Sequence, residues 1–126
     1  MDNGRVSEPS VRLLPDRLGL VVRLQARPGA RAAVLDALHR YADRLDEEPR
    51  TELFVISLDP DEADVVWLHE WFAQGEDGML AHRSSPGFAE LMGDLQDVLA
   101  VDPQMMRFDP LRIHLATGLF SDDDAD

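Results

Sequence analysis

The sequence predicts an α+β fold with the ferredoxin-like element order β-α-β-β-α-β, in which helices cover one face of an antiparallel sheet. Two kinds of pattern support this prediction: apolar residues alternate with period two in four segments and recur at helical spacing in two others. With 126 residues, of which 44% are hydrophobic and 29% charged, the chain has the size and composition of one globular domain.

The N-terminal half is predicted to contain a strand and then a long helix. Leu18–Arg27 alternates apolar side chains along a strand, which Pro28 and Gly29 end. Ala30–Glu48 repeats apolar residues at helical spacing, and Pro49 stops this helix. The helix therefore connects the first two strands, as the predicted fold requires.

A β-hairpin is predicted next along the chain. Thr51–Leu58 and Val65–Phe72 are both typical of strands, and Asp59, Pro60 and Asp61 lie between them. Proline and aspartate favour tight turns, because proline presets its φ angle and aspartate can hydrogen-bond the turn backbone. We therefore expect these two strands to pair antiparallel.

The C-terminal part is predicted to contain a short helical turn, a second helix and a last strand. Gly75–Arg83 forms the helical turn, and Ser85 is a candidate N-cap before Pro86 at the first position of the second helix. The apolar stripe of this helix consists of Phe88, Leu91, Met92, Leu95, Val98 and Leu99. Pro103 interrupts the chain, and Met105–Thr117 is expected to form the final strand.

Composition argues against several kinds of function. A net charge of −13 argues against nucleic acid and membrane surfaces as partners. The chain has no cysteine, which excludes disulfides and thiolate chemistry, and no lysine, which excludes a Schiff base. Residues 1–17 are expected to form a flexible arm without a signal peptide, and residues 119–126 an acidic, disordered tail. We therefore expect a cytoplasmic protein with its domain at residues 18–118.

The strand over residues 65–72 presents two bulky faces. Trp67, His69 and Trp71 share one face, because successive side chains of a strand point to opposite sides. Glu70 lies on the other face, where a covered carboxylate needs a partner or has a shifted pKa. Helices can cover only one face, so a second copy of the chain, packed sheet to sheet, is the expected cover of the other.

Three motifs resemble the antibiotic biosynthesis monooxygenase domain. The segment 21–29 (VVRLQARPG) resembles its first strand and Pro-Gly turn, and Glu70-Trp71-Phe72 resembles its pattern of Glu, any residue and an aromatic. His82, followed by Ser85-Pro86-Gly87-Phe88, resembles its helix signature. The resemblance covers residues 18–118 and implies a dimeric α/β barrel, formed when the sheets of two ferredoxin-like units face each other.

The resemblance also implies which residues line the pocket and which face the partner subunit. It places the pocket between the sheet and the helices, with substrate-binding walls at Val22, Leu68, Phe72, Phe88 and Met92. Trp67, His69 and Trp71, together with Arg23 on the same face, are then expected at the dimer interface, where Arg23 is a candidate to neutralise a carboxylate of the partner.

Two departures from the family pattern limit the chemistry. Leu68 and Phe72 stand where the polyketide oxygenases have Asn and Trp, so a substrate phenolate lacks that Asn as a hydrogen-bond donor. Val22, His82 and Met92 occupy positions where the heme-degrading relatives use Asn, Trp and a His ligand, which argues against heme degradation.

The leading functional prediction is a cofactor-independent monooxygenase that oxidises an apolar aromatic, polyketide-like or quinol-like molecule with dioxygen. His82 is the expected base and Glu70 the carboxylate that orients it, because imidazole titrates near neutrality and can take a proton from a phenol. The alternatives are a buried His–Glu hydrogen bond with a purely structural role, a non-catalytic ligand-binding or scaffold dimer, and a biosynthetic cyclase or isomerase. No cofactor is expected, and the four histidines show no metal-binding spacing.

Overall fold

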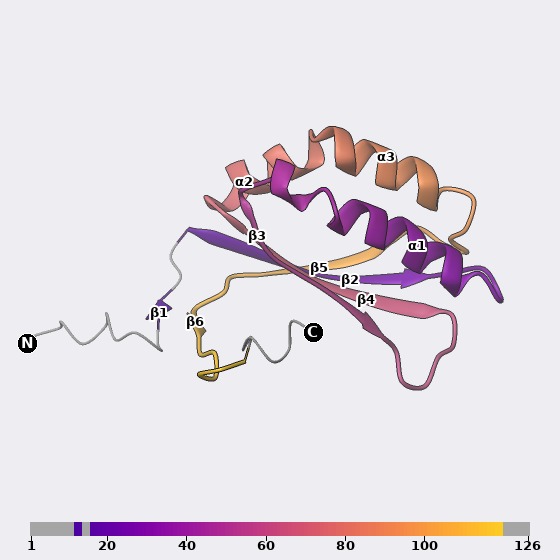
Figure 1. Ribbon diagram of the computed structural model, residues 1–126, viewed down its shortest axis with the longest axis horizontal. Helices are drawn as coiled ribbons and strands as arrows, with labels where there is room; N and C mark the ends of the chain where they lie inside the picture. Colours follow the sequence, from indigo (N-terminus) through magenta and orange to yellow (C-terminus); the bar gives the residue numbers. More distant parts are fainter. Residues whose placement is uncertain (1–11, 14–15, 120–126) are drawn as a thin grey trace, which may run out of the picture. The chain divides into compact units, whose positions relative to one another are not determined.

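The computed structural model describes residues 12–13 and 16–119 (Figure 1). Residues 16–109 form one compact unit, and the described residues from 110 onward belong with residues 12–13 to a second unit. In the second unit, β1 (Arg12–Leu13) pairs antiparallel with β6 (Arg112–Ile113). Most of the expected N-terminal arm and the acidic tail after residue 119 lie outside the described residues.

The larger unit confirms the predicted α+β fold with an antiparallel four-stranded sheet. The strands lie in the order β3-β4-β2-β5, which is the ferredoxin-like order. In chain order the elements are β2 (Arg17–Gln25), α1 (Arg31–Ala42), β3 (Thr51–Leu58), β4 (Val65–Ala73), α2 (Gly75–Arg83), α3 (Pro86–Leu95) and β5 (Gln104–Phe108).

The three helices α1, α2 and α3 lie on the same face of this sheet (Figure 1). The two central strands, β2 and β4, pair so that Val22 lies opposite Leu68 and Leu20 opposite Glu70. These four side chains are buried under the helices, because alternate residues of both strands point to the covered face. The alternate residues that point to the covered face of the sheet therefore form both the core and the sheet side of the pocket.

The first predicted helix ends earlier than the sequence pattern indicates. Helix α1 stops at Ala42 and is followed by the short 3-10 turn η2 (Leu45–Glu47), so the expected helix to Glu48 is wrong at its C-terminal end. Glu48 has φ −128° and ψ 71°, because the ring of Pro49 disfavours helical backbone at the residue before it. Because α1 ends early, Glu48 lies outside the helix with a non-helical backbone.

The last predicted strand is also shorter than expected. Met105–Thr117 was predicted as one strand, whereas β5 ends at Phe108 and β6 pairs with β1 rather than with the sheet. Pro110 lies between the two pieces and has no backbone N–H for a ladder hydrogen bond. The strand is therefore interrupted where proline enters the chain.

The face of the sheet opposite the helices carries exposed and half-buried apolar side chains. They are Val21, Leu53, Val55, Trp67, Trp71, Met106 and Phe108, and His69 lies exposed among them. The ring of Phe108 covers Gly19, where a Cβ atom would lie 2.2 Å from the ring. None of the helices in the described part of the chain is long and apolar enough to cross a membrane.

Candidate functional site

Helix α2 places His82 against the end of the central strand β4. The backbone of Gly78 lies so close to the strand that a Cβ atom there would be 1.9 Å from the carbonyl oxygen of Ala73. This close approach requires glycine, and it brings the ring of His82 to 4.8 Å from the ring of Phe72, between centroids. His82 is 6% exposed, so its imidazole lies in the core between the helices and the sheet.

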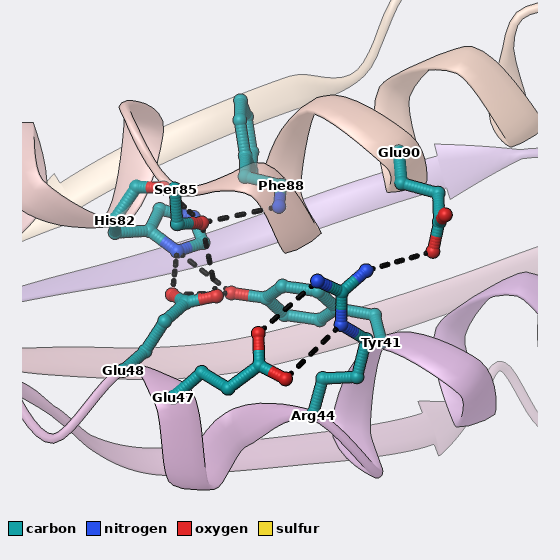
Figure 2. A network of polar contacts seen from close by, with 8 residues as sticks. All are labelled: Tyr41, Arg44, Glu47, Glu48, His82, Ser85, Phe88 and Glu90. Carbon is teal, nitrogen blue, oxygen red and sulfur yellow. Dashed lines mark hydrogen bonds and ion pairs between the residues drawn. The ribbon is translucent and has the colours of Figure 1, made fainter.

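The Nδ1 side of the His82 ring faces Glu48 and the polar groups around this carboxylate (Figure 2). The Nδ1 atom of His82 lies 3.0 Å from Oε1 of Glu48 and 2.8 Å from the hydroxyl of Tyr41. Oε1 also accepts hydrogen bonds from the Tyr41 hydroxyl at 2.8 Å and from Thr51 Oγ1 at 3.3 Å. The Ser85 hydroxyl lies 3.0 Å from Oε2. Glu48 therefore ties together β3, α1, α2 and the start of α3.

These contacts determine which nitrogen of His82 carries the proton. Burial raises the pKa of the Tyr41 phenol, and the hydrogen bond to Glu48 adds to the shift, so the phenol stays protonated and donates. Burial also lowers the pKa of His82, against the opposing effect of its hydrogen bond to Glu48, so the ring is held neutral. A carboxylate 3.0 Å from Nδ1 favours the tautomer with the proton on Nδ1. The lone pair is then on Nε2.

The other side of the ring faces Glu70. Oε1 of Glu70 lies 3.8 Å from Nε2 of His82, too far for a hydrogen bond, and has no hydrogen-bond partner among the residues that the structure describes. Burial raises the pKa of Glu70 to about 7, and the negative charge of Glu48 contributes to the shift. Near neutral pH, Glu70 therefore exists in both protonation states.

A cavity of about 320 Å³ opens beside these two groups, and its lining is mostly apolar. Four of the five residues expected to bind substrate line it: Val22, Leu68, Phe88 and Met92. Phe72 does not line the cavity, because it is fully buried and packs beneath the His82 ring. The lining also includes Tyr41, Glu70, His82 and Arg83, so polar groups and apolar walls meet in one space.

Glu48 is the site residue that the sequence reasoning missed. Glu70 was the predicted orienting carboxylate, but Glu48 is the carboxylate that accepts the hydrogen bond of Nδ1. No local pattern identified Glu48, because α1 ends at Ala42 and Glu48 follows η2 with a non-helical backbone, so helical spacing does not relate it to Tyr41. The distance in sequence to His82, 34 residues, hid the pairing itself.

The residues expected at the dimer interface all lie on the open face of the sheet, and two of them have partners within the chain. The indole N–H of Trp67 donates to Oδ2 of Asp59 at 2.8 Å. The guanidinium of Arg23, predicted to neutralise a carboxylate of the partner, pairs with Glu62 of its own chain at 3.2 Å. No group of three or more metal-ligating side chains is gathered within the described ranges 12–13 and 16–119.

A family model for antibiotic biosynthesis monooxygenases matches residues 17–93, more than half of the sequence. The chain belongs to the antibiotic biosynthesis monooxygenase family. The match includes both central strands, α2 with His82 and most of α3. A search of curated proteins finds no match.

Solved structures of family members and of uncharacterised proteins share this fold. A protein of unknown function from Nitrosomonas europaea is 26% identical, with a TM-score of 0.69 over 81% of this chain and 96% of the other. A Caulobacter crescentus protein assigned to the same family is 18% identical, with a TM-score of 0.70 over 77% and 92%. A cofactor-independent oxygenase from Streptomyces nogalater, SnoaB, is 17% identical, with a TM-score of 0.65 over 75% and 92%.

Proposed function

We propose that this protein is a cofactor-independent monooxygenase that oxidises a phenolic, quinol-like or polyketide-like aromatic molecule with dioxygen. The observation that carries the proposal is the position of His82, whose Nδ1 lies against Glu48 while its Nε2 lies buried 3.8 Å from Glu70 beside a largely apolar cavity. The family of the chain supports oxygenase chemistry, and one structural neighbour is described as a cofactor-independent oxygenase.

His82 acts as the general base in this proposal. Nε2 takes the proton of the substrate hydroxyl, and the imidazolium that forms is stabilised by Glu48 at Nδ1. Glu48 thus takes the orienting role that the sequence assigned to Glu70. Glu70, in its protonated form, can donate a hydrogen bond to the phenolate oxygen, a role that its raised pKa supports.

The phenolate delivers electron density to a ring carbon that bears hydrogen, and this carbon reacts with dioxygen. One oxygen atom is retained as the new carbonyl of the quinone, and the other leaves as water with the hydrogens from the ring carbon and the hydroxyl. The substrate loses four electrons, and these electrons reduce both atoms of dioxygen. The reaction therefore needs no separate reductant. The apolar walls around Phe88 and Met92 support this step, because they exclude water from the reactive carbanion.

The proposed working form is a homodimer packed through the open faces of two sheets. Apolar side chains such as Val55 and Met106, 40% and 63% exposed, make this face unfavourable in water. Trp67, His69 and Trp71 lie on the same face. Sedimentation of wild type as a dimer, and of Val55→Glu as a monomer, is the expected result; a monomeric wild type overturns this part of the proposal.

Oxygen uptake with a panel of anthrones, hydroquinones and polycyclic phenols tests the activity. Wild type is expected to consume oxygen with at least one of them, and His82→Ala to lose about 100-fold or more of that rate. His39→Ala is the matched control, since His39 is an exposed histidine on α1. Unchanged turnover in His82→Ala contradicts the proposal. Binding without oxygen uptake indicates a ligand-binding dimer instead, and conversion without uptake indicates a cyclase or isomerase.

A further inference from the structure

We infer that the cavity binds hydroxyaryl carboxylates: Arg83 holds the carboxylate, and the hydroxyl lies between Glu70 and His82. The inference rests on the proposed site and narrows its substrate class from apolar aromatics to aromatic acids. Three observations carry it: an arginine in the cavity lining, an unpartnered buried carboxylate in the same lining, and apolar walls around them.

Arg83 is a positive charge in the lining of a mostly apolar cavity. It is the last residue of α2, is exposed to solvent, and follows His82 directly in the chain. Its charge also contributes to lowering the pKa of His82, so the guanidinium lies close enough to act on the site electrostatically. Among residues 12–13 and 16–119 its guanidinium has no hydrogen-bond or ion-pair partner.

Arg83 shares this lack of a side-chain partner with Arg31, Arg50 and Arg112 among the described residues, but of these four arginines only Arg83 belongs to the cavity lining. Aspartate and glutamate outnumber arginine by 25 to 12, and acidic partners hold the arginines at positions 17, 23, 40, 44 and 107. Arg83 instead lines the cavity. Guanidinium is the side-chain group best suited to bind a carboxylate, because it presents paired donors in one plane.

The buried acceptor in the cavity lining requires a different ligand group. Oε1 of Glu70 is buried without a partner, and Nε2 of His82 lies 3.8 Å away. A hydroxyl satisfies Oε1 in both protonation states of Glu70, because it can donate to the carboxylate and accept from the acid. A ligand carboxylate beside this acceptor would repel Glu70, so the acid group of the ligand is directed to Arg83.

The apolar part of the cavity lining suits a flat aromatic body. Leu68, Phe88, Leu91 and Met92 line the cavity, whose volume of about 320 Å³ lies at the lower end of the range for small-molecule sites. A fused two-ring aromatic that carries both a hydroxyl and a carboxylate meets all three requirements.

Binding of three related naphthalenes to the full-length protein, measured by calorimetry, tests this inference. They are 6-hydroxy-2-naphthoate, its neutral amide 6-hydroxy-2-naphthamide, and 2-naphthoate without the hydroxyl. Wild type is expected to bind the hydroxy acid about five- to tenfold more tightly than either of the others. Arg83→Gln is expected to remove the preference over the amide while amide binding stays unchanged.

Arg31→Gln is the matched control, because it makes the same charge change on a residue outside the cavity lining. It should keep the full preference for the hydroxy acid. Equal binding of acid and amide by wild type overturns the inference, as does an Arg83→Gln variant that keeps the preference, or no binding of any of the three. Oxygen uptake is measured in a separate experiment. Failure of the predicted preference for the acid therefore does not decide whether the protein is an oxygenase.

Discussion

The two sides of the His82 ring differ in almost every physical respect. At Nδ1, Glu48 receives hydrogen bonds from Tyr41, Thr51 and the imidazole itself. At Nε2, Glu70 lies 3.8 Å away, and its Oε1 has no hydrogen-bond partner within the described chain. Both carboxylates are buried, yet one is surrounded by donors and the other is not.

This difference separates a structural role from a ligand-binding role within one residue. The Glu48 side holds the ring in place and sets its tautomer, because its donors come from separate elements of the fold. The Glu70 side borders the cavity and leaves a buried acceptor that a ligand can satisfy. Substitutions on the two sides should therefore affect stability in opposite ways.

The largest effect is expected from Glu48→Ala. Removing this carboxylate leaves the Tyr41 hydroxyl and His82 Nδ1 without their acceptor in the core, which costs about 3 kcal/mol of unfolding free energy. Urea denaturation measures the change, with Glu47→Ala as the control because Glu47 is exposed and contacts only Arg44 among the described residues. A loss no larger than that of the control would show that Glu48 does not organise the site.

The second prediction concerns Glu70→Gln and pH. The pKa of Glu70 rises from 4.5 to about 7 on folding, so the folded state binds more protons than the unfolded state between these values. Wild-type stability from this group is therefore present below pH 4.5 and is lost as the pH rises to about 7.

Relative to wild type, Glu70→Gln should therefore gain about 3 kcal/mol of unfolding free energy between about pH 4 and about pH 8. Urea denaturation of both proteins at the two pH values measures this difference. A pH-independent difference would mean that the pKa of Glu70 does not change on folding, and a difference of opposite sign would mean that the fold stabilises the charged carboxylate; either result contradicts a buried carboxylate without a hydrogen-bond partner.

The smallest effect is expected from Ser85→Ala. The Ser85 hydroxyl accepts the backbone N–H of Phe88 as the N-cap of α3 and lies 3.0 Å from Glu48 Oε2. Loss of a cap of this kind costs about 1 kcal/mol, while Glu48 keeps its other donors. Thermal unfolding compares this variant with Ser84→Ala, the exposed neighbouring serine. Equal midpoints for the two variants would contradict the assigned role.

Local patterns predicted the elements of the fold, and the family resemblance predicted which side of β4 faces the helices. Alternation along residues 65–72 predicted two bulky faces, and the resemblance placed Leu68 and Phe72 in the pocket walls; the structure buries both side chains on the same face as Glu70. Ser85 and Pro86 marked the start of α3 through cap chemistry that depends only on neighbouring residues. The alternation and the cap need no knowledge of the rest of the molecule, whereas the choice between the two faces does.

The hydrogen bonds of the site could not be predicted in the same way. Glu48 and His82 are 34 residues apart, and they meet only because Gly78 lets α2 approach β4 and because α1 ends before Pro49. The covered position of Glu70 predicted that its carboxylate has either a partner or a shifted pKa. Its lack of a hydrogen-bond partner among the described residues depends on where the neighbouring donors lie. The pairing of β1 with β6 likewise follows from contacts distant in sequence.

The tautomer of His82 tests the central claim most directly, since it depends on both sides of the ring at once. Long-range proton–nitrogen NMR of the ¹⁵N-labelled protein, recorded where His82 is neutral, distinguishes a protonated Nδ1 from a protonated Nε2. We predict the proton on Nδ1, with the chemical shift of Nε2 moving when 6-hydroxy-2-naphthoate is added. A proton on Nε2 would contradict the account, because His82 would then have no lone pair facing Glu70 and the cavity.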